Sequence, residues 1–232
     1  MIPLSRRAIA EFLGTFILVT AGAGAIVVNE LTLAVTHPGI SLVFGLVVLA
    51  LIYTYGDVSG CHINPAVTIG FVAARRFPAR EAAVYIVAQC AGAIAAAVLL
   101  RELFPDGKTL GATLPTGGIW PSFVLEVFLT WFLMLAVLRV STGSKEKGIT
   151  AGIAIGAIIG LEALFGGPIS GASMNPARSL GPALVGARIG DLWIYIAAPI
   201  LGALIAVPTF ALTEPPGSSA GSAEPPEQGR TA

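Results

Sequence analysis

Two short stretches of the sequence carry the residue types best suited to handling a polar solute. Asn64-Pro65-Ala66 lies in "GCHINPAVTIG", and Asn175-Pro176-Ala177 lies in "GASMNPARSLG", at an offset of 111 residues. Asparagine is a strong helix N-cap and proline fits the first helical turn, so each motif predicts a helix start. A carboxamide that caps a helix through its oxygen can still point N–H donors at a solute. The chemistry predicted for these residues is hydrogen bonding to a passing polar molecule.

The other polar residues do not predict catalysis. No nucleophile is spaced with a base, and no metal-ligand cluster is evident. His62 stands two residues before Asn64 without a second ligand at useful spacing, which favours packing within the loop over metal binding. Cys61 and Cys90 lie in apolar surroundings, which favours two buried thiols over a disulfide. We therefore expect neither an enzyme nor a bound metal or cofactor.

Composition indicates a membrane protein. The 232 residues are 55% hydrophobic and only 11% charged, against about 25% charged in an average soluble domain. Mean hydropathy is +0.86. Such a chain cannot cover itself with polar side chains, so membrane lipid is its expected surrounding. A formal net charge of zero argues against a nucleic-acid partner.

Apolar runs predict six spanning helices and two shorter ones. A helix needs about 20 apolar residues to cross a bilayer, and two runs, 64–74 and 175–185, are too short. The first segment lacks a clear cleavage site and is expected to stay as an anchor. The tail 214–232 is rich in Pro, Gly, Ser and Glu and is predicted to be disordered, which leaves one membrane domain over 1–213. The predicted spans are 8–28, 40–56, 81–100, 120–140, 148–166 and 191–211.

The chain is predicted to be two copies of one unit, about 6–100 and 120–211. Ser59-Gly60 recurs as Ser170-Gly171 in step with the two Asn-Pro-Ala motifs. Glu11 with Thr15 recurs as Glu126 with Thr130 at an offset of 115, and Tyr85-Ile86 recurs as Tyr195-Ile196 at 110. Because each copy has three spans, the second must enter the membrane from the opposite side, which makes the repeats inverted.

The distribution of lysine and arginine predicts that both termini are cytoplasmic. If each short segment enters and leaves on one side, nine of these residues fall inside and four outside. The inner set is Arg6, Arg7, Arg75, Arg76, Arg80, Arg139, Lys145, Lys147 and Arg230, and the outer set is Arg101, Lys108, Arg178 and Arg188.

Two helices that begin in mid-membrane require a special environment. Non-helical backbone at that depth is tolerated only inside protein or beside a water-filled cavity. The two amino ends would meet at the centre, each with roughly half a positive charge from its macrodipole. Such a centre opposes cations and hydronium and admits neutral molecules.

These features resemble the aquaporin, or major intrinsic protein, family. The resemblance rests on the paired Asn-Pro-Ala motifs, Arg178 directly after the second, and Glu11 and Glu126 in the first and fourth spans. It covers about residues 6–211. The stretches "GPISGASMNPARSLGPALV" and "HPGISLVFGLVV" are most similar to plant nodulin-like intrinsic proteins and their bacterial aquaglyceroporin-like relatives. The resemblance implies an all-α channel with six transmembrane helices and two re-entrant half-helices, and a homotetramer with one pore per protomer.

The resemblance also implies where solutes are selected. The four positions of the family's selectivity filter fall on Phe44, Ala163, Ala172 and Arg178. Water-specific relatives usually carry histidine at the position of Ala163, and often threonine or cysteine at the position of Ala172. Two alanines predict a wider, less polar constriction that admits glycerol, and possible further solutes are urea and undissociated metalloid acids.

Three acids within the predicted spans and one at the inner pore mouth need separate interpretations. For Glu11 and Glu126, hydrogen bonds to the backbone of the re-entrant loops are favoured over a proton relay. Glu162 has two open alternatives, bracing the loop at 167–171 or lining the outer pore. Asp57 replaces a histidine common in relatives and is expected at a solvated helix end.

Two other functions are the alternatives to a glycerol-permeable channel. One is a water-selective channel. The other is a secondary transporter with inverted repeats, which would need an acidic or histidine chain for ion coupling that the spans do not contain. A plasma membrane or bacterial inner membrane is the expected location.

Overall fold

The computed structural model describes residues 2–141 and 145–213, and this part of the chain forms eight α-helices. Six are long and apolar enough to cross a membrane. These are α1 (Leu4–Thr32), α2 (Thr36–Ser59), α4 (Ala79–Leu103), α5 (Ile119–Val140), α6 (Lys145–Ser170) and α8 (Leu192–Leu212). The two short helices are α3 (Pro65–Ala73) and α7 (Pro176–Val185). Each contains or overlaps its predicted range, and the disorder predicted for the tail lies outside the described residues.

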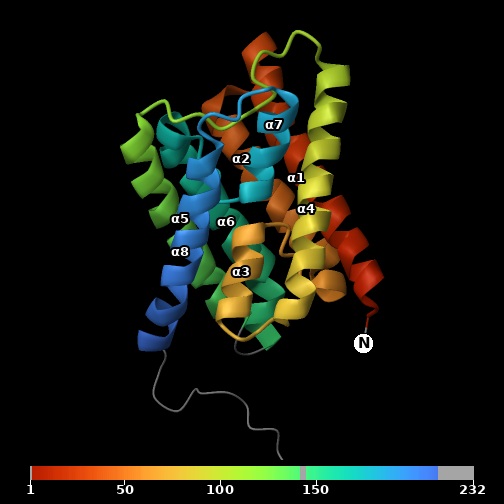
Figure 1. Cartoon of the computed structure of the whole chain (residues 1–232), viewed down its shortest axis with the longest axis vertical. Helices are drawn as coiled ribbons and strands as arrows, with labels where there is room; N and C mark the ends of the chain where they lie inside the picture. Colours follow the sequence, from red (N-terminus) through yellow and green to blue (C-terminus); the bar gives the residue numbers. More distant parts are fainter. Residues whose placement is uncertain (1, 142–144, 214–232) are drawn as a thin grey trace, which may run out of the picture.

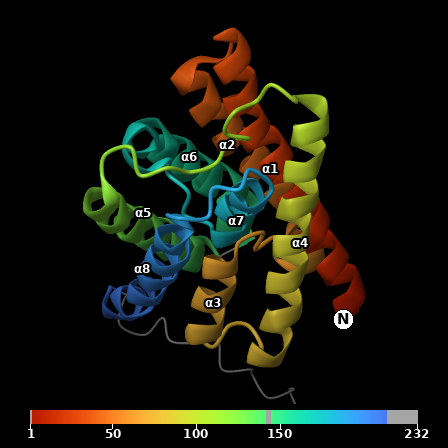
Figure 2. The same ribbon diagram turned by 45° about the horizontal axis from the view of Figure 1, so that its top comes forward.

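The six long helices surround the two short ones (Figures 1 and 2). Helices α3 and α7 lie one above the other near the centre, with their asparagine-capped starts facing each other. The start of α1 and the end of α8 lie at the same end of the molecule in Figure 1. An even number of crossings requires this arrangement, so the fold agrees with the predicted count of spans.

The two repeats pack internally in the same way. A Cβ on Gly92 of α4 would lie 2.3 Å from the Phe12 carbonyl oxygen of α1. Its counterpart in the second repeat is Gly202 of α8, where a Cβ would lie 2.3 Å from the Val127 carbonyl oxygen of α5. Only glycine allows these backbones to approach so closely, as is common between membrane helices.

Each short helix also contacts the opposite repeat. Helix α3 of the first repeat packs on α8, and α7 of the second repeat packs on α4. The two repeats are therefore interlocked at the centre, where the loops before α3 and α7 meet. This interlock places both Asn-Pro-Ala motifs at one site.

Candidate functional site

The two asparagines cap the short helices with the same geometry. Asn64 Oδ1 accepts a hydrogen bond from the Ala66 amide at 2.9 Å. Asn175 Oδ1 accepts from the amides of Ala177 at 3.0 Å and Arg178 at 3.2 Å. Proline occupies the first turn of each helix, where it has no N–H to leave unpaired. Both helices therefore begin at a satisfied, buried cap.

The side-chain NH2 group of each asparagine forms a hydrogen bond to the opposite loop. Asn64 Nδ2 donates to the Met174 carbonyl and Asn175 Nδ2 donates to the Ile63 carbonyl, both at 2.8 Å. The sequence suggested that the side-chain N–H groups of both asparagines point into the lumen. Instead, one N–H of each carboxamide is used across the loop contact, because each loop presents a carbonyl directly before its asparagine. One N–H per asparagine is left for a molecule in the cavity.

Ile63 and Met174 are held from both sides. Their carbonyls accept from the asparagines, and their amides donate to Glu11 at 2.6 Å and Glu126 at 2.8 Å. Both residues have positive φ angles, 43° for Ile63 and 55° for Met174, a conformation that is strained for a side chain such as isoleucine. The surrounding hydrogen bonds hold the loops in this shape.

Glu11 and Glu126 are fully buried, and both bind loop backbone. Glu11 accepts from the Ser59 hydroxyl, the amides of His62 and Ile63, and the Gln89 side chain. Glu126 accepts from the Ser170 hydroxyl and the amides of Ser173 and Met174. Each acid thus satisfies amides that a loop in mid-membrane cannot expose to lipid.

Two residues that bind polar side chains of this site, Gln89 and Gly111, were not identified from the sequence. Gln89 Nε2 donates to Glu11 at 2.8 Å and to the Thr68 hydroxyl at 3.0 Å. A polar amide in the apolar stretch "YIVAQCAGA" was the available signal, because such residues in spans face the protein interior. Gly111, whose carbonyl binds Arg178, gave no sequence signal because it acts through its backbone.

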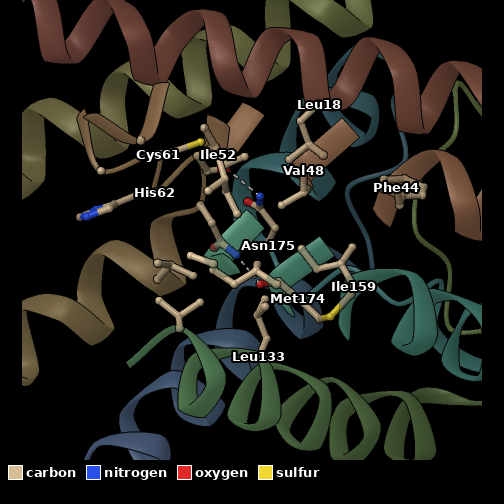
Figure 3. A pocket seen from close by; sticks show the side chains of 18 of the residues that line it. Leu18, Phe44, Val48, Ile52, Cys61, His62, Leu133, Ile159, Met174 and Asn175 are labelled. Carbon is tan, nitrogen blue, oxygen red and sulfur yellow. Dashed lines mark hydrogen bonds between the residues drawn. The ribbon is translucent and has the colours of Figure 1, made fainter. Parts of the chain in front are cut away.

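A cavity of about 930 Å³ runs past both asparagines and brings the four predicted filter residues into its wall. Figure 3 shows Asn175 and Met174 at its centre, Phe44 farther along one side, and the His62 ring directed away from Asn175. The side chains of Ala163 and Ala172 are buried and add little bulk. This wall is apolar apart from a few convergent polar groups, which is typical of a small-molecule pathway.

Arg178 is the one fully buried cation described in the structure and is 1% exposed. Its Nη1 donates to the Gly111 carbonyl at 2.7 Å. Its guanidinium carbon lies 5.1 Å from the centroid of the Phe44 ring, in a cation–π contact. Nε and Nη2 have no hydrogen-bond partner among the described residues. Arg178 therefore combines a fixed position with N–H groups that remain to be paired.

Glu162 follows neither of its two predicted alternatives. The side chain is fully buried and is not among the residues that line the cavity. Neither carboxyl oxygen has a hydrogen-bond partner within the described ranges, so no bond braces the loop at 167–171.

The remaining singled-out residues lie beside the pathway. Asp57 is exposed and lines the cavity on α2. His62 stacks on Phe71 with ring centroids 4.7 Å apart, and its Nδ1 lies 3.1 Å from the Thr68 hydroxyl. Cys61 and Cys90 are free thiols. Across the described residues, no group of three or more His, Cys, Asp or Glu side chains is placed to hold a metal ion.

Comparison with known proteins identifies relatives over nearly the whole chain. Residues 1–210 match the family model of the major intrinsic proteins. Aquaporin NIP1-4 of Oryza sativa subsp. japonica is 49% identical over 205 residues, which cover 88% of this chain and 75% of that protein. Nodulin-26 of Glycine max is 45% identical over 205 residues, covering 88% and 76%.

A solved structure shares the fold. The aquaglyceroporin from Plasmodium falciparum superposes with a TM-score of 0.82 and 25% sequence identity, over 90% of this chain and 96% of that one. The six spans and the two short helices are thus those of a known channel architecture. The chain belongs to the major intrinsic protein family and is a non-enzymatic channel that crosses the membrane six times.

Proposed function

We propose that this protein is a passive channel for water and small neutral solutes such as glycerol, and that it excludes protons and ions. The observation that carries the proposal is the set of residues at one part of the cavity wall. Phe44 offers an aromatic face, Arg178 offers N–H donors, and Ala163 and Ala172 leave space between them. Glycerol has a carbon edge for the ring and hydroxyls for the arginine, and urea and undissociated metalloid acids share this character.

Exclusion of ions is assigned to the centre of the pathway and to Arg178. The starts of α3 and α7 meet there, and each carries about half a positive charge from its macrodipole. Asn64 and Asn175 each retain one N–H donor, so a water molecule between them acts as an acceptor toward both. A hydrogen-bonded file of water would be interrupted at that point, which opposes proton transfer.

The proposal also has support from the relatives. The solved structure with the same fold is an aquaglyceroporin, and the curated relatives are named as aquaporins or as a nodulin. We further propose, as the resemblance of the paired motifs to the family implies, that the functional unit is a homotetramer with one pore in each protomer. Both termini lie in the cytoplasm, and the location is the plasma membrane or a bacterial inner membrane.

Osmotic light scattering with reconstituted vesicles tests the solute range. The wild type should admit water and glycerol above the lipid background, and urea should be measured alongside. Water flux without glycerol flux would mean a water-selective channel. Glycerol flux that saturates and follows an ion gradient would favour a secondary transporter.

A double variant tests the assigned filter. Ala163→His with Ala172→Thr adds bulk and polar atoms at the constriction, and should lower glycerol flux by about tenfold while water flux stays within about twofold. Ala151→His is the matched control, because Ala151 lines the same cavity on the same helix, about three turns away. Unchanged glycerol entry in the double variant would show that the filter lies elsewhere.

A further inference from the structure

The end of α6 contains a proline that leaves one backbone carbonyl without its helical partner. Pro168 lies inside the helix, two residues before its end at Ser170. In a regular helix, the amide of residue 168 would donate to the carbonyl of Leu164. Proline has no N–H, and its ring crowds that same carbonyl. The Leu164 carbonyl therefore needs another donor, and it belongs to the residue directly after the filter residue Ala163.

His37 at the start of α2 supplies that donor. Its Nε2 lies 2.7 Å from the Leu164 carbonyl oxygen. Because a carbonyl only accepts, Nε2 must carry the proton in this contact. Gly167 makes room for the ring, since a Cβ there would lie 2.7 Å from His37 Cε1. A proline, a glycine and a histidine from two helices thus form one local arrangement.

The arrangement joins the two helices that carry opposite sides of the filter. Phe44 follows His37 on α2 by about two turns, and Ala163 precedes Leu164 on α6. The start of α2 is itself fixed, because the Thr36 amide donates to Asn29 Oδ1 of α1 at 2.7 Å. Deeper in the membrane the same pair of helices is in close contact, where a Cβ on Gly45 would lie 2.7 Å from the Gly156 carbonyl.

We propose that His37 is a positioning residue for the selectivity filter, which sets the spacing of Ala163 from Phe44 by replacing the helical hydrogen bond that Pro168 removes. The proposal rests on the filter assigned under the proposed function. Loss of the bond frees the turn around Leu164 to shift, while the last residues of α6 stay bound through the carbonyls of Pro168 and Ile169. Passage of a solute that fills the constriction depends more on this spacing than passage of water does.

Two substitutions at His37 test the bond. His37→Leu removes the donor, and the ratio of glycerol to water permeability should change by about fivefold, mainly through lower glycerol flux. That factor corresponds to about 1 kcal/mol, the usual net value of one hydrogen bond. His37→Gln keeps an N–H donor and should stay within about twofold of the wild type. An equal loss of water and glycerol flux in His37→Leu, or no change at all, would overturn the proposal.

Pro168→Ala provides the matched background. It restores an N–H at residue 168, which can donate to the Leu164 carbonyl within α6. In that background, His37→Leu should change the permeability ratio by less than about twofold. If His37→Leu had as large an effect in Pro168→Ala as in the wild type, His37 would act through something other than this carbonyl.

A spectroscopic measurement decides the proposal separately from glycerol flux. The chain has two histidines, so the ¹⁵N imidazole spectrum of the reconstituted protein can be assigned by comparison with His37→Gln. Neutral His37 should be protonated at Nε2, and an Nδ1-protonated ring would overturn the proposed bond. Wild-type glycerol flux at the lipid background would overturn the polyol proposal alone. The His37 variants would then be judged by the ratio of urea to water permeability. If urea is also excluded, the spectrum alone would decide whether the bond exists.

Discussion

The two repeats share a frame and differ in what they present to the pore. Each has a buried glutamate that binds loop amides, an asparagine cap and a glycine that allows close helix contact. At an offset of 111, Ala163, Ala172 and Arg178 of the second repeat correspond to Ile52, Cys61 and Val67 of the first. All six line the cavity. Duplication therefore supplies the backbone support, and the copies have diverged at the positions to which we assign selectivity.

The same offset exposes differences behind the pore wall. Pro168 corresponds to Asp57, and Glu162 corresponds to Leu51. Asp57 thus keeps its backbone N–H in α2, whereas Pro168 has none in α6, where His37 binds the Leu164 carbonyl. Leu51 is a buried apolar residue, whereas Glu162 is a buried acid without a hydrogen-bond partner in the described part of the chain. The second repeat therefore carries a helix-interior proline and a buried acid close to the proposed filter.

Removing the shared glutamates should have the largest effect. Glu126→Ala would leave the amides of Ser173 and Met174 and the Ser170 hydroxyl without their acceptor. At about 1–3 kcal/mol for each unsatisfied buried group, the protein should lose about 3 kcal/mol or more. Glu11→Ala should be at least as damaging, because Gln89 also loses one of its two acceptors. Thermal unfolding in detergent micelles measures both.

The exposed Glu102, which stands near the end of α4, provides a matched control. Glu102→Ala should change stability by less than about 0.5 kcal/mol. If Glu126→Ala were as mild as this control, the loops would have other support, and the shared frame would not depend on its acids.

Replacing Glu162 by its counterpart should have the opposite sign. Glu162→Leu installs the residue found at Leu51 and removes two buried oxygens that lack hydrogen-bond partners in the described ranges. Stability should rise by about 1–3 kcal/mol, measured by the same unfolding experiment. The ratio of glycerol to water permeability should stay within about twofold, because the side chain does not line the cavity.

Glu126→Leu is the control for this change, since it makes the same substitution at an acid that accepts three hydrogen bonds. It should be strongly destabilising. A loss of stability in Glu162→Leu as well would mean that the Glu162 carboxyl contributes an interaction after all.

Much of the frame could be predicted from the sequence, because repetition and capping are local signals. The offset between Asn64 and Asn175 indicated two facing helix starts, and the paired Glu11 and Glu126 indicated support for the loops. Contacts made through backbone could not be predicted. The carbonyls of Gly111 and Leu164 bind Arg178 and His37. Pro168 marks the Leu164 carbonyl as unpaired within α6, but nothing in the sequence indicates which side chain binds either carbonyl. For the same reason the sequence did not show that one side-chain N–H of Asn64 and of Asn175 binds a backbone carbonyl of the opposite loop.

The two related tyrosines give the smallest and most direct test of the divergence. Tyr85 donates to the Ser59 carbonyl at 2.8 Å and accepts from Arg7 Nε at 2.9 Å. Tyr195, its counterpart at offset 110, is equally buried, but its hydroxyl has no hydrogen-bond partner among the described residues. The first repeat thus uses this hydroxyl to hold its loop, and the second does not.

Tyr85→Phe should therefore cost about 1–2 kcal/mol, since it leaves the Ser59 carbonyl unpaired. Tyr195→Phe should be neutral or slightly stabilising, because a buried hydroxyl without a partner already carries its desolvation cost. The two variants remove the same atom at related positions, so each controls the other in thermal unfolding. Equal losses would mean that the second repeat retains a tyrosine bond to its loop, and that the two copies share this support.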